Sequence, residues 1–290
     1  MRTLDRDTVE RTTETVRAFY EANPFPNYDD LDTRESLVEK AGRGIFARLL
    51  TEQIPAGARV LEAGCGTGQL SNFLGMRWNL KVYGADLCQH SLRLANEFRT
   101  RTGIQNAAFV QMNLFHPVFP PASFDIVISN GVLHHTADPY GAFRSIATLV
   151  KPGGYILVGL YNHIGRLPTD FRRLLIRVFG DGARLLDSHL RNKNYNDARK
   201  RAWFMDQYKH PRESKHSFSE VIGWYEANGF DFVSSIPRID GGVFGPEEKL
   251  FSPHSKGTAL SRLTTELAML LTGGADGALF IVIGRKRPAA

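Results

Sequence analysis

The 290-residue sequence predicts an α/β fold built on an open, mostly parallel β-sheet. Short apolar segments typical of strands alternate with amphipathic segments typical of helices from about residue 36 to residue 160. No internal repeat or low-complexity segment interrupts this alternation. With 42% hydrophobic and 11% aromatic residues, the chain can bury a large core without disulfide or metal cross-links.

Five strands are expected in the first half of the chain: ARVLEAG (58–64), KVYGADL (81–87), AAFVQMNL (107–114), FDIVISNGVL (124–133) and YILVGLYN (155–162). Helices are expected after the first, second and fourth of them: QLSNFLGMRW (69–78), SLRLANEFRTRTG (91–103) and PYGAFRSIATLV (139–150). The fourth strand is almost continuously apolar, as is usual for a strand covered on both faces. Residues 151–154, Lys-Pro-Gly-Gly, are predicted to form a tight turn before the fifth strand.

The regular alternation stops between His163 and His216, where two helical segments carry no strand between them. It then resumes as helix, strand, helix and strand: SFSEVIGWYEANGF (217–230), DFVSSIPRI (231–239), TALSRLTTELAMLLT (258–272) and ALFIVIGRK (278–286). The pattern therefore predicts four segments: an N-terminal helix and loop that cover the site (1–35), a core (36–162), an inserted helical cap after strand five (163–216) and a C-terminal completion of the core (217–290).

Composition and charge exclude several classes of protein. No apolar run approaches the roughly 20 residues of a membrane span. The N-terminus carries charges where a signal peptide is apolar, so a cytoplasmic location is expected. Cys65 and Cys88 form no metal-ligand spacing and are too few for a disulfide framework. The net charge of +6 indicates either a solvated basic surface or an acidic partner. The first is favoured, because the Lys and Arg residues are dispersed except in FRRLLIRVFG, ARKRAW and GRKRPAA.

The segment VLEAGCGTGQL (60–70) carries Gly64, Gly66 and Gly68 directly after the first strand. In open parallel sheets, ligands bind beyond the carboxyl ends of the strands, where this loop would lie. A dinucleotide-binding loop needs its third glycine at residue 69, which is glutamine here, so that interpretation is weak. A phosphate-binding P-loop needs a following lysine, and the segment has none.

Two carboxylates narrow the choice of ligand. Glu62, just before the loop, would repel a pyrophosphate and attract an ammonium group. Asp86, at the end of the second strand and 22 residues after Gly64, can accept both hydroxyls of a ribose. S-adenosylmethionine has an ammonium, a sulfonium and an adenosine, so it fits these demands better than a dinucleotide does.

The glycine loop VLEAGCGTG, Asp86 and the segment FDIVISNGVLHHTADPYGAFRSIATLVKPGGYILVGLY resemble the class I S-adenosylmethionine-dependent methyltransferases. The resemblance covers residues 40–160 closely and residues 217–286 by pattern. It implies a Rossmann-like seven-stranded sheet with helices on both faces, an antiparallel last strand, and methyl transfer with release of S-adenosylhomocysteine. A looser resemblance to uncharacterised bacterial methyltransferase-like proteins, carried by GLYNHIGRL and DQYKHPRESKH, implies a distinct subfamily and no substrate.

The resemblance assigns cofactor contacts to residues at the strand ends: Glu62, Gly64, Gly66 and Gly68 for the methionine part, Asp86 for the ribose, Leu87 for the adenine face, and Asn130 and Gly131 beside the sulfonium. Asn113 stands where the family often has an aspartate that accepts a hydrogen bond from the adenine amino group. An asparagine carbonyl can accept the same bond without a charge.

Methyl transfer requires a nucleophile held in line with the methyl group and the sulfur, and a hydroxyl or ammonium acceptor also requires a base. His134 and His135 follow the fourth strand, and a neutral imidazole is a suitable base. A structural role, with one ring packed under the loop, is the alternative. Tyr161, Asn162 and His163 leave the fifth strand toward the same site, and Tyr161 joins the two histidines as a candidate catalytic residue.

The cap and the N-terminal loop are expected to determine acceptor specificity. The cap segment WFMDQYKHPRESKH concentrates polar side chains: Asp206, Tyr208, His210, Glu213 and His216. They lack a metal-ligand spacing, so polar lining without a metal is expected. In the N-terminal segment, Tyr20, Phe25 and Tyr28 either close over the cofactor or pin the loop to the surface.

The cap segment FRRLLIRVFGDGARLL (171–186) is amphipathic, with apolar residues opposite arginines. Its residues are Leu174, Leu175, Val178 and Phe179 against Arg172, Arg173 and Arg177. Such a helix either lies on an anionic membrane or packs its apolar face on the domain, and the second interpretation is favoured.

Three hypotheses for function remain open. The favoured one is methyl transfer to a small molecule, apolar or lipid-like. A protein or RNA substrate is the second, and the basic excess is its only support. The third is a non-catalytic domain that binds S-adenosylmethionine, because an intact glycine loop argues only for binding.

Overall fold

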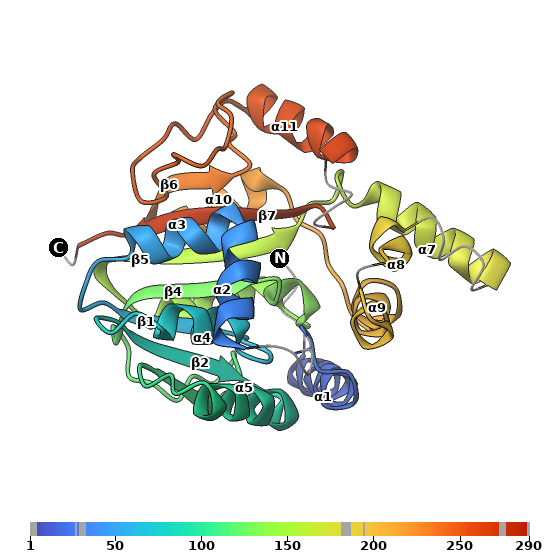
Figure 1. The fold of residues 1–290 in the computed structure, drawn as a ribbon. Helices are drawn as coiled ribbons and strands as arrows, with labels where there is room; N and C mark the ends of the chain where they lie inside the picture. The colour runs from blue at the N-terminus through green and yellow to red at the C-terminus, as the bar shows by residue number, and fades with distance from the viewer. Residues whose placement is uncertain are drawn as a thin grey trace.

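A seven-stranded sheet crosses the molecule in the order β3-β2-β1-β4-β5-β7-β6 (Figure 1). Its strands are β1 (Arg59–Ala63), β2 (Lys81–Asp86), β3 (Ala107–Gln111), β4 (Phe124–Asn130), β5 (Val150–Tyr161), β6 (Phe230–Ile236) and β7 (Leu279–Lys286). Strands β1 to β5 pair in parallel, and β7 pairs antiparallel with β5 and β6. The predicted Rossmann-like, mostly parallel sheet with an antiparallel last strand is confirmed.

The computed structural model describes residues 5–26, 28, 33–180, 187–193, 195–272 and 277–288. The α-helices of these residues are α1 (Arg6–Ala22), α2 (Arg34–Arg43), α3 (Ile45–Gln53), α4 (Gln69–Gly75), α5 (Gln89–Arg101), α6 (Pro139–Ala147), α7 (Leu167–Phe179), α8 (Ser188–Arg191), α9 (Asp197–Phe204), α10 (Phe218–Ala227) and α11 (Ala259–Thr272). A short 3₁₀ helix, η1 (Leu133–His135), and a π-helical turn, η3 (Met205–Lys209), complete them.

Both faces of the sheet are covered, because apolar side chains alternate along its strands. Leu61 of β1 packs into one core cluster together with residues of α6 and α10. Val60, its neighbour, packs into the other cluster with residues of α3 and α4. This two-sided burial fixes the register of the strands and holds their carboxyl ends at one edge.

Four strands differ from their predicted bounds by three or more residues. β4 ends at Asn130 and β6 at Ile236, each three residues before the predicted end. β3 ends at Gln111 rather than residue 114, because Asn113 forms an isolated bridge with His116 instead. β5 starts at Val150, before the predicted turn, since Val150 already pairs with Phe124 of β4. The register shifts between Phe124 and Ile126, so residues 151–154 form an irregularity within the strand rather than a turn before it.

The segment 163–216 leaves the sheet after β5 and returns to it before α10. Its described residues form helices and turns and, apart from an isolated bridge between Asn162 and His216, no strand. In Figure 1, α7, α8 and α9 lie together on one side of the sheet, with α1 next to α9. The cap is therefore close to the N-terminal helix, although nearly two hundred residues separate them in the sequence.

Helix α7 corrects one interpretation. Leu174, Val178 and Phe179 were expected to pack on the domain, but they are 54–72% exposed. The favoured interpretation of this amphipathic helix is therefore wrong for these residues. The predicted segment continues over residues 181–186, which lie outside the described residues.

Candidate functional site

A cavity of about 860 Å³ lies where the carboxyl ends of β1, β2, β4 and β5 meet the cap and α1. Ten of the twelve predicted site residues line it: Glu62, Gly64, Gly66, Asp86, Leu87, Asn113, Asn130, Gly131, His135 and Tyr161. Gly68 and His134 are not among its lining residues. Strand ends that are far apart in the sequence thus contribute to one cavity, as expected for a parallel sheet.

The glycine loop is shaped by close backbone contacts. Gly66 has a φ of +52°, and a Cβ atom there would lie 2.3 Å from the carbonyl oxygen of Phe25. Gly68 has a φ of +72° at the start of α4, and its Cβ would lie 2.5 Å from the Phe109 ring. The first glycine lets the N-terminal segment cross the loop, whereas Gly68 serves the packing of α4 on the sheet.

Asp86 ties the glycine loop to the end of β2. Its Oδ2 accepts a hydrogen bond from the Gly66 N–H over 2.8 Å, and its Oδ1 accepts one from the Cys88 N–H over 2.8 Å. Burial raises the pKa of the carboxyl, and these backbone hydrogen bonds oppose the shift. Each carboxylate oxygen keeps a further lone pair, so Asp86 fits a partner with two neighbouring hydroxyls.

Glu62 is a buried carboxylate whose hydrogen-bond partners are neutral. Its Oε2 accepts from the backbone N–H of Ser71 over 2.9 Å and also from the Ser71 hydroxyl. Burial raises its pKa to about 7, although the bonds from Ser71 lower it in part. A cation in the cavity would favour the ionised carboxylate, so the site fits a ligand with an ammonium group.

Two asparagines at strand ends offer amide groups to the cavity. The Oδ1 of Asn130 is buried and accepts no hydrogen bond from the part of the chain that the structure describes. The Oδ1 of Asn113 accepts from the N–H of Phe115 over 3.0 Å. Because a carbonyl oxygen has two lone pairs, Asn113 can accept a second bond from a ligand.

The two histidines of η1 form a hydrogen-bonded chain. His135 Nδ1 lies 2.8 Å from the carbonyl oxygen of Arg212, and the two Nε2 atoms lie 3.0 Å apart. Since a carbonyl only accepts, we infer that His135 Nδ1 carries its proton and that its Nε2 accepts from His134. Burial lowers the pKa of His135 to about 4. His135 is therefore neutral above that pH and has no nitrogen free of partners.

A second chain of hydrogen bonds runs along the wall of the cavity, from α1 to the cap. The Tyr20 hydroxyl donates to Asp206 Oδ1 over 3.0 Å. Gln207 Nε2 donates to Asp206 Oδ2 over 2.9 Å and to the Tyr161 hydroxyl over 2.8 Å. Burial raises the pKa of Asp206 above its ordinary value. Tyr20, Asp206, Gln207 and Tyr161 all line the cavity, so this chain forms its polar wall at the cap.

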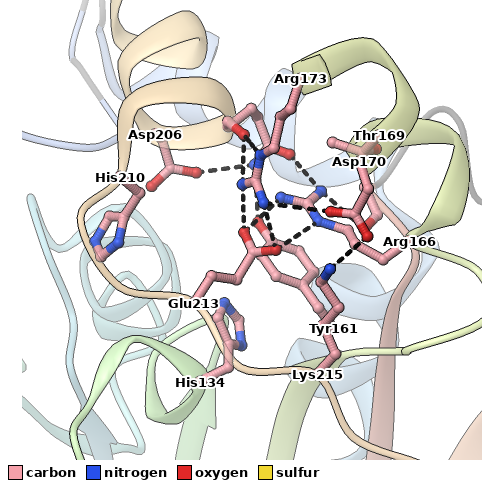
Figure 2. A network of polar contacts seen from close by, with 12 residues as sticks. His134, Tyr161, Arg166, Thr169, Asp170, Arg173, Asp206, His210, Glu213 and Lys215 are labelled. Atoms are coloured by element: carbon pink, nitrogen blue, oxygen red, sulfur yellow. Dashed lines mark hydrogen bonds and ion pairs between the residues drawn. The ribbon is translucent and has the colours of Figure 1, made fainter. Parts of the chain in front are cut away.

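A buried ion cluster holds the cap in place (Figure 2). Arg166 is fully buried and binds Glu213 with two hydrogen bonds, of 3.1 and 2.8 Å. Arg173 of α7 binds the same carboxylate over 2.9 and 2.6 Å. Burial alone would raise the pKa of Glu213, but the two guanidinium groups outweigh it and lower the pKa to about 2. The Arg166 guanidinium also lies 3.8 Å above the centre of the Tyr161 ring, which joins the cluster to the cavity wall.

Comparison with known proteins agrees with this geometry. A family model described as a methyltransferase domain matches residues 61–158, which include the glycine loop, Asp86 and the end of β4. The chain carries a class I S-adenosylmethionine-dependent methyltransferase domain. The predicted family and cofactor are thereby confirmed.

The individual relatives match this chain only in part and at modest sequence identity. An uncharacterised protein of Synechococcus is 26% identical over 78% of this chain and 60% of that protein. The ubiquinone biosynthesis O-methyltransferase of Albidiferax ferrireducens is 33% identical over 40% of this chain and 45% of that protein. The chain thus spans about half the length of the curated relatives it matches.

A solved structure shares the fold of the methyltransferase domain. The S-adenosylmethionine-dependent methyltransferase of Methanosarcina mazei aligns with a TM-score of 0.52 at 16% identity, covering 83% of this chain and 98% of that one. At this identity the likeness concerns the fold alone.

The other candidate residues of the cap contact neighbouring side chains and do not line the cavity. Tyr208 donates its hydroxyl to Asp187, and His216 lies 2.8 Å from the Ser214 hydroxyl and 3.1 Å from Glu220. His210 stacks on His135, with ring centres 3.7 Å apart. Within the described residues, no group of three His, Cys, Asp or Glu side chains could hold a metal ion.

The N-terminal aromatic residues divide between the two roles considered for them. Tyr20 and Phe25 line the cavity. Tyr28 instead stacks on Phe98 of α5, with ring centres 4.5 Å apart, and accepts a hydrogen bond from Asn72. Both interpretations therefore apply, each to a different part of the segment.

Sequence reasoning missed Gln207 and Arg166 as parts of the site. They are separated by 41 residues and meet through a hydrogen bond of 2.6 Å. No spacing rule links residues so far apart. The only signal was that both occur in the two segments that resemble a bacterial subfamily, GLYNHIGRL and DQYKHPRESKH.

Proposed function

We propose that the protein transfers a methyl group from S-adenosylmethionine to a small-molecule acceptor. The observation that carries this proposal is a single cavity that joins the glycine loop and Asp86 to the polar wall of Tyr20 and Asp206. Its volume of about 860 Å³ lies in the range of roughly 300–1,000 Å³ usual for small-ligand sites. Helix α1 and the cap both line it, which favours a small acceptor over a macromolecule.

In this proposal the cofactor contacts are those predicted from the sequence except Gly68, which packs against Phe109 instead. Glu62 binds the ammonium group, Asp86 the ribose, and Leu87 and Asn113 the adenine, with Gly64, Gly66, Asn130 and Gly131 around the methionine part. When bound, S-adenosylmethionine supplies an electrophilic methyl group on its sulfonium. The protein excludes water from this end of the cavity and holds the acceptor in line.

The acceptor has a polar group beside an apolar part. Asp206 and Tyr20 provide a proton acceptor and a hydroxyl at the cap. Ile45, Phe46 and Phe244 line another portion of the same cavity with apolar side chains. A hydroxyl or amine on an apolar or lipid-like skeleton meets both demands. The partial likeness to the ubiquinone biosynthesis O-methyltransferase supports this class.

Two residues are candidates for the base that removes a proton from the acceptor. Asp206 accepts two hydrogen bonds and retains free lone pairs. His135, which the sequence suggests, lines the cavity as a neutral ring, with Tyr161 beside it as a positioning group. His134 does not line the cavity, and its Nε2 lies 3.0 Å from the Nε2 of His135.

The test is incubation of the full chain with cell extract and methyl-labelled S-adenosylmethionine, followed by separation of small molecules, lipids, protein and RNA. We expect label in the small-molecule or lipid fraction. Label confined to protein or RNA, with loss of activity at high salt, would favour a macromolecular substrate. Calorimetry without binding of S-adenosylmethionine would contradict the proposal altogether.

A further inference from the structure

Helix α7 presents a continuous apolar stripe to solvent. Leu167, Phe171, Leu174, Val178 and Phe179 are 54–72% exposed. The first four are spaced by four, three and four residues, which puts them on one side of the helix. Of the residues of α7, only Thr169 and Ile176 are buried. The helix is about 20 Å long, since each of its 13 residues adds about 1.5 Å.

The polar side of α7 faces the domain, which reverses the usual orientation of a surface helix. Arg173 is bound by Glu213 and donates a hydrogen bond to the carbonyl oxygen of Gln207 over 2.8 Å. Arg172 also lies 3.7 Å from Asp187. These contacts hold the apolar stripe outward, and Figure 1 shows α7 extending away from the sheet. Arg177 stays exposed beside the stripe.

The basic excess of the whole chain is concentrated in the cap. Residues 163–216 contain 13 Lys and Arg against 6 Asp and Glu. The rest of the chain has 23 Lys and Arg against 24 Asp and Glu. The cap therefore carries a net charge of +7, and the remainder is nearly neutral. Two of the three basic clusters in the sequence, FRRLLIRVFG and ARKRAW, lie in this segment.

We propose that α7 docks on the surface of an anionic phospholipid bilayer, with its apolar stripe in the interface and the cationic cap against the headgroups. An exposed apolar helix face with Arg177 beside it, on a segment with a net charge of +7, is the chemistry that such a surface recognises. A second copy of the chain would bring two strongly cationic caps together, which disfavours self-association through this face. Among the helices that the structure describes, none could span a bilayer.

The test is co-sedimentation of the full chain with vesicles of phosphatidylcholine alone and of phosphatidylcholine mixed with phosphatidylglycerol. We expect binding to the mixed vesicles that weakens as salt is added, because the headgroup attraction is screened. Phe171→Ser combined with Val178→Ser should raise the lipid concentration for half-maximal binding at least about tenfold, since both changes remove apolar surface from the interface.

Trp78→Ser is the matched control. Trp78 is also highly exposed, at 86%. It precedes β2 and so lies near the amino ends of the strands, whereas the cap follows the carboxyl end of β5. Its substitution should leave vesicle binding unchanged. Because all three side chains are exposed, circular dichroism should show the same fold for every variant.

Several outcomes would overturn the proposal. One is that the wild type binds neither type of vesicle, and another is that it binds neutral vesicles as tightly as anionic ones. If the double variant bound vesicles as tightly as the wild type, α7 would not be the element that contacts the bilayer. Light scattering that detects a dimer, dissociated by the same double variant, would assign the stripe to a second copy instead. None of these outcomes depends on methyl transfer.

Discussion

The hydroxyl of Tyr20 lies 3.0 Å from Asp206 Oδ1, across 186 residues of sequence. The bond joins α1 to the cap at the cavity wall. Neither segment belongs to the methyltransferase core, yet together they close the end where the proposed acceptor binds. The position of α1 over the cavity therefore depends in part on one hydrogen bond to a buried carboxylate.

Removing this hydroxyl should weaken the closure. Tyr20→Phe should lower the free energy of unfolding by about 1–3 kcal/mol, because Asp206 is left with one hydrogen bond fewer in a buried place. Label transfer from the cofactor should fall at least about tenfold, since the acceptor end is less well held. Urea unfolding and the labelling assay measure the two effects. Tyr155→Phe, in the middle of β5 and not among the lining residues of the cavity, is the control, and an equal loss of activity there would contradict the assignment.

Asp86 should be the strongest single determinant of cofactor affinity. Asp86→Ala removes the acceptor for the ribose and also frees the N–H groups of Gly66 and Cys88. We expect the Kd for S-adenosylmethionine to rise about 100-fold, which corresponds to about 2.7 kcal/mol. Asp125→Ala removes another carboxylate that accepts a backbone N–H, at the opposite end of β4. Calorimetry should show an unchanged Kd for that control.

Glu62 should make cofactor binding dependent on pH. Its pKa is raised to about 7, so below that pH the carboxyl is largely protonated in the free protein. Binding an ammonium group then requires loss of this proton, and one pH unit corresponds to about 1.4 kcal/mol. The Kd should therefore rise up to about tenfold from pH 7 to pH 6. The ligand ammonium, with an ordinary pKa of about 8, stays charged in this range.

Glu62→Gln should abolish most of this dependence, because the amide does not titrate. Calorimetry in two buffers of different ionisation enthalpy should detect proton release by the wild type near pH 6 and not by the variant. A Kd of the wild type that is flat between pH 6 and pH 7 would contradict the binding of an ammonium group at Glu62.

The core of the fold was predictable because its signals are local. Val60–Ala63 is an apolar strand with the glycines directly behind it, and Asp86 is the last residue of the next strand, so each feature can be recognised within its own short segment. The family match over residues 61–158 covers this same part of the chain. Ten predicted residues line one cavity for this reason.

The cap was harder to predict because its contacts are not local. Arg173 faces Glu213, so this arginine of α7 points inward and Leu174 points outward, opposite to the favoured interpretation of the helix. A helical period reveals two faces but not which one meets the domain. That choice depends on the partner Glu213, forty residues away along the chain.

Glu213 should stabilise the fold against acid. Its pKa is about 2 in the folded protein and 4.5 in its ordinary state, so its contribution is complete above pH 4.5 and is lost as the pH falls toward 2. The contribution is on the order of 3 kcal/mol. Glu213→Gln should cost about 3–5 kcal/mol at neutral pH, since Arg166 stays buried without its counter-charge.

Thermal and urea unfolding against pH measure this effect, and the exposed pair of Arg48 and Glu52 provides the comparison. Glu52→Gln should change the free energy of unfolding by less than about 1 kcal/mol at every pH. If the two variants were equally stable at pH 7, the ion cluster would not be what holds the cap.

The proton acceptor in the proposed reaction should be Asp206 rather than His135. Both nitrogens of His135 are engaged, by Arg212 and by His134, and burial holds its pKa at about 4, which makes it a weak base. Asp206 lies on the cavity wall with free lone pairs, and burial raises its pKa and hence its basicity. Asp206→Asn keeps the shape of the side chain and removes the base.

Asp206→Asn should slow label transfer at least about 100-fold, as is typical for loss of a general base. It should leave the Kd for S-adenosylmethionine within about threefold, because its partners lie at the cap rather than the glycine loop. His135→Phe keeps an aromatic ring against His210 and should slow transfer less than about tenfold. The reverse order of the two effects would return the role of base to His135. The geometry would then require its Nε2 to exchange His134 for the acceptor during the reaction.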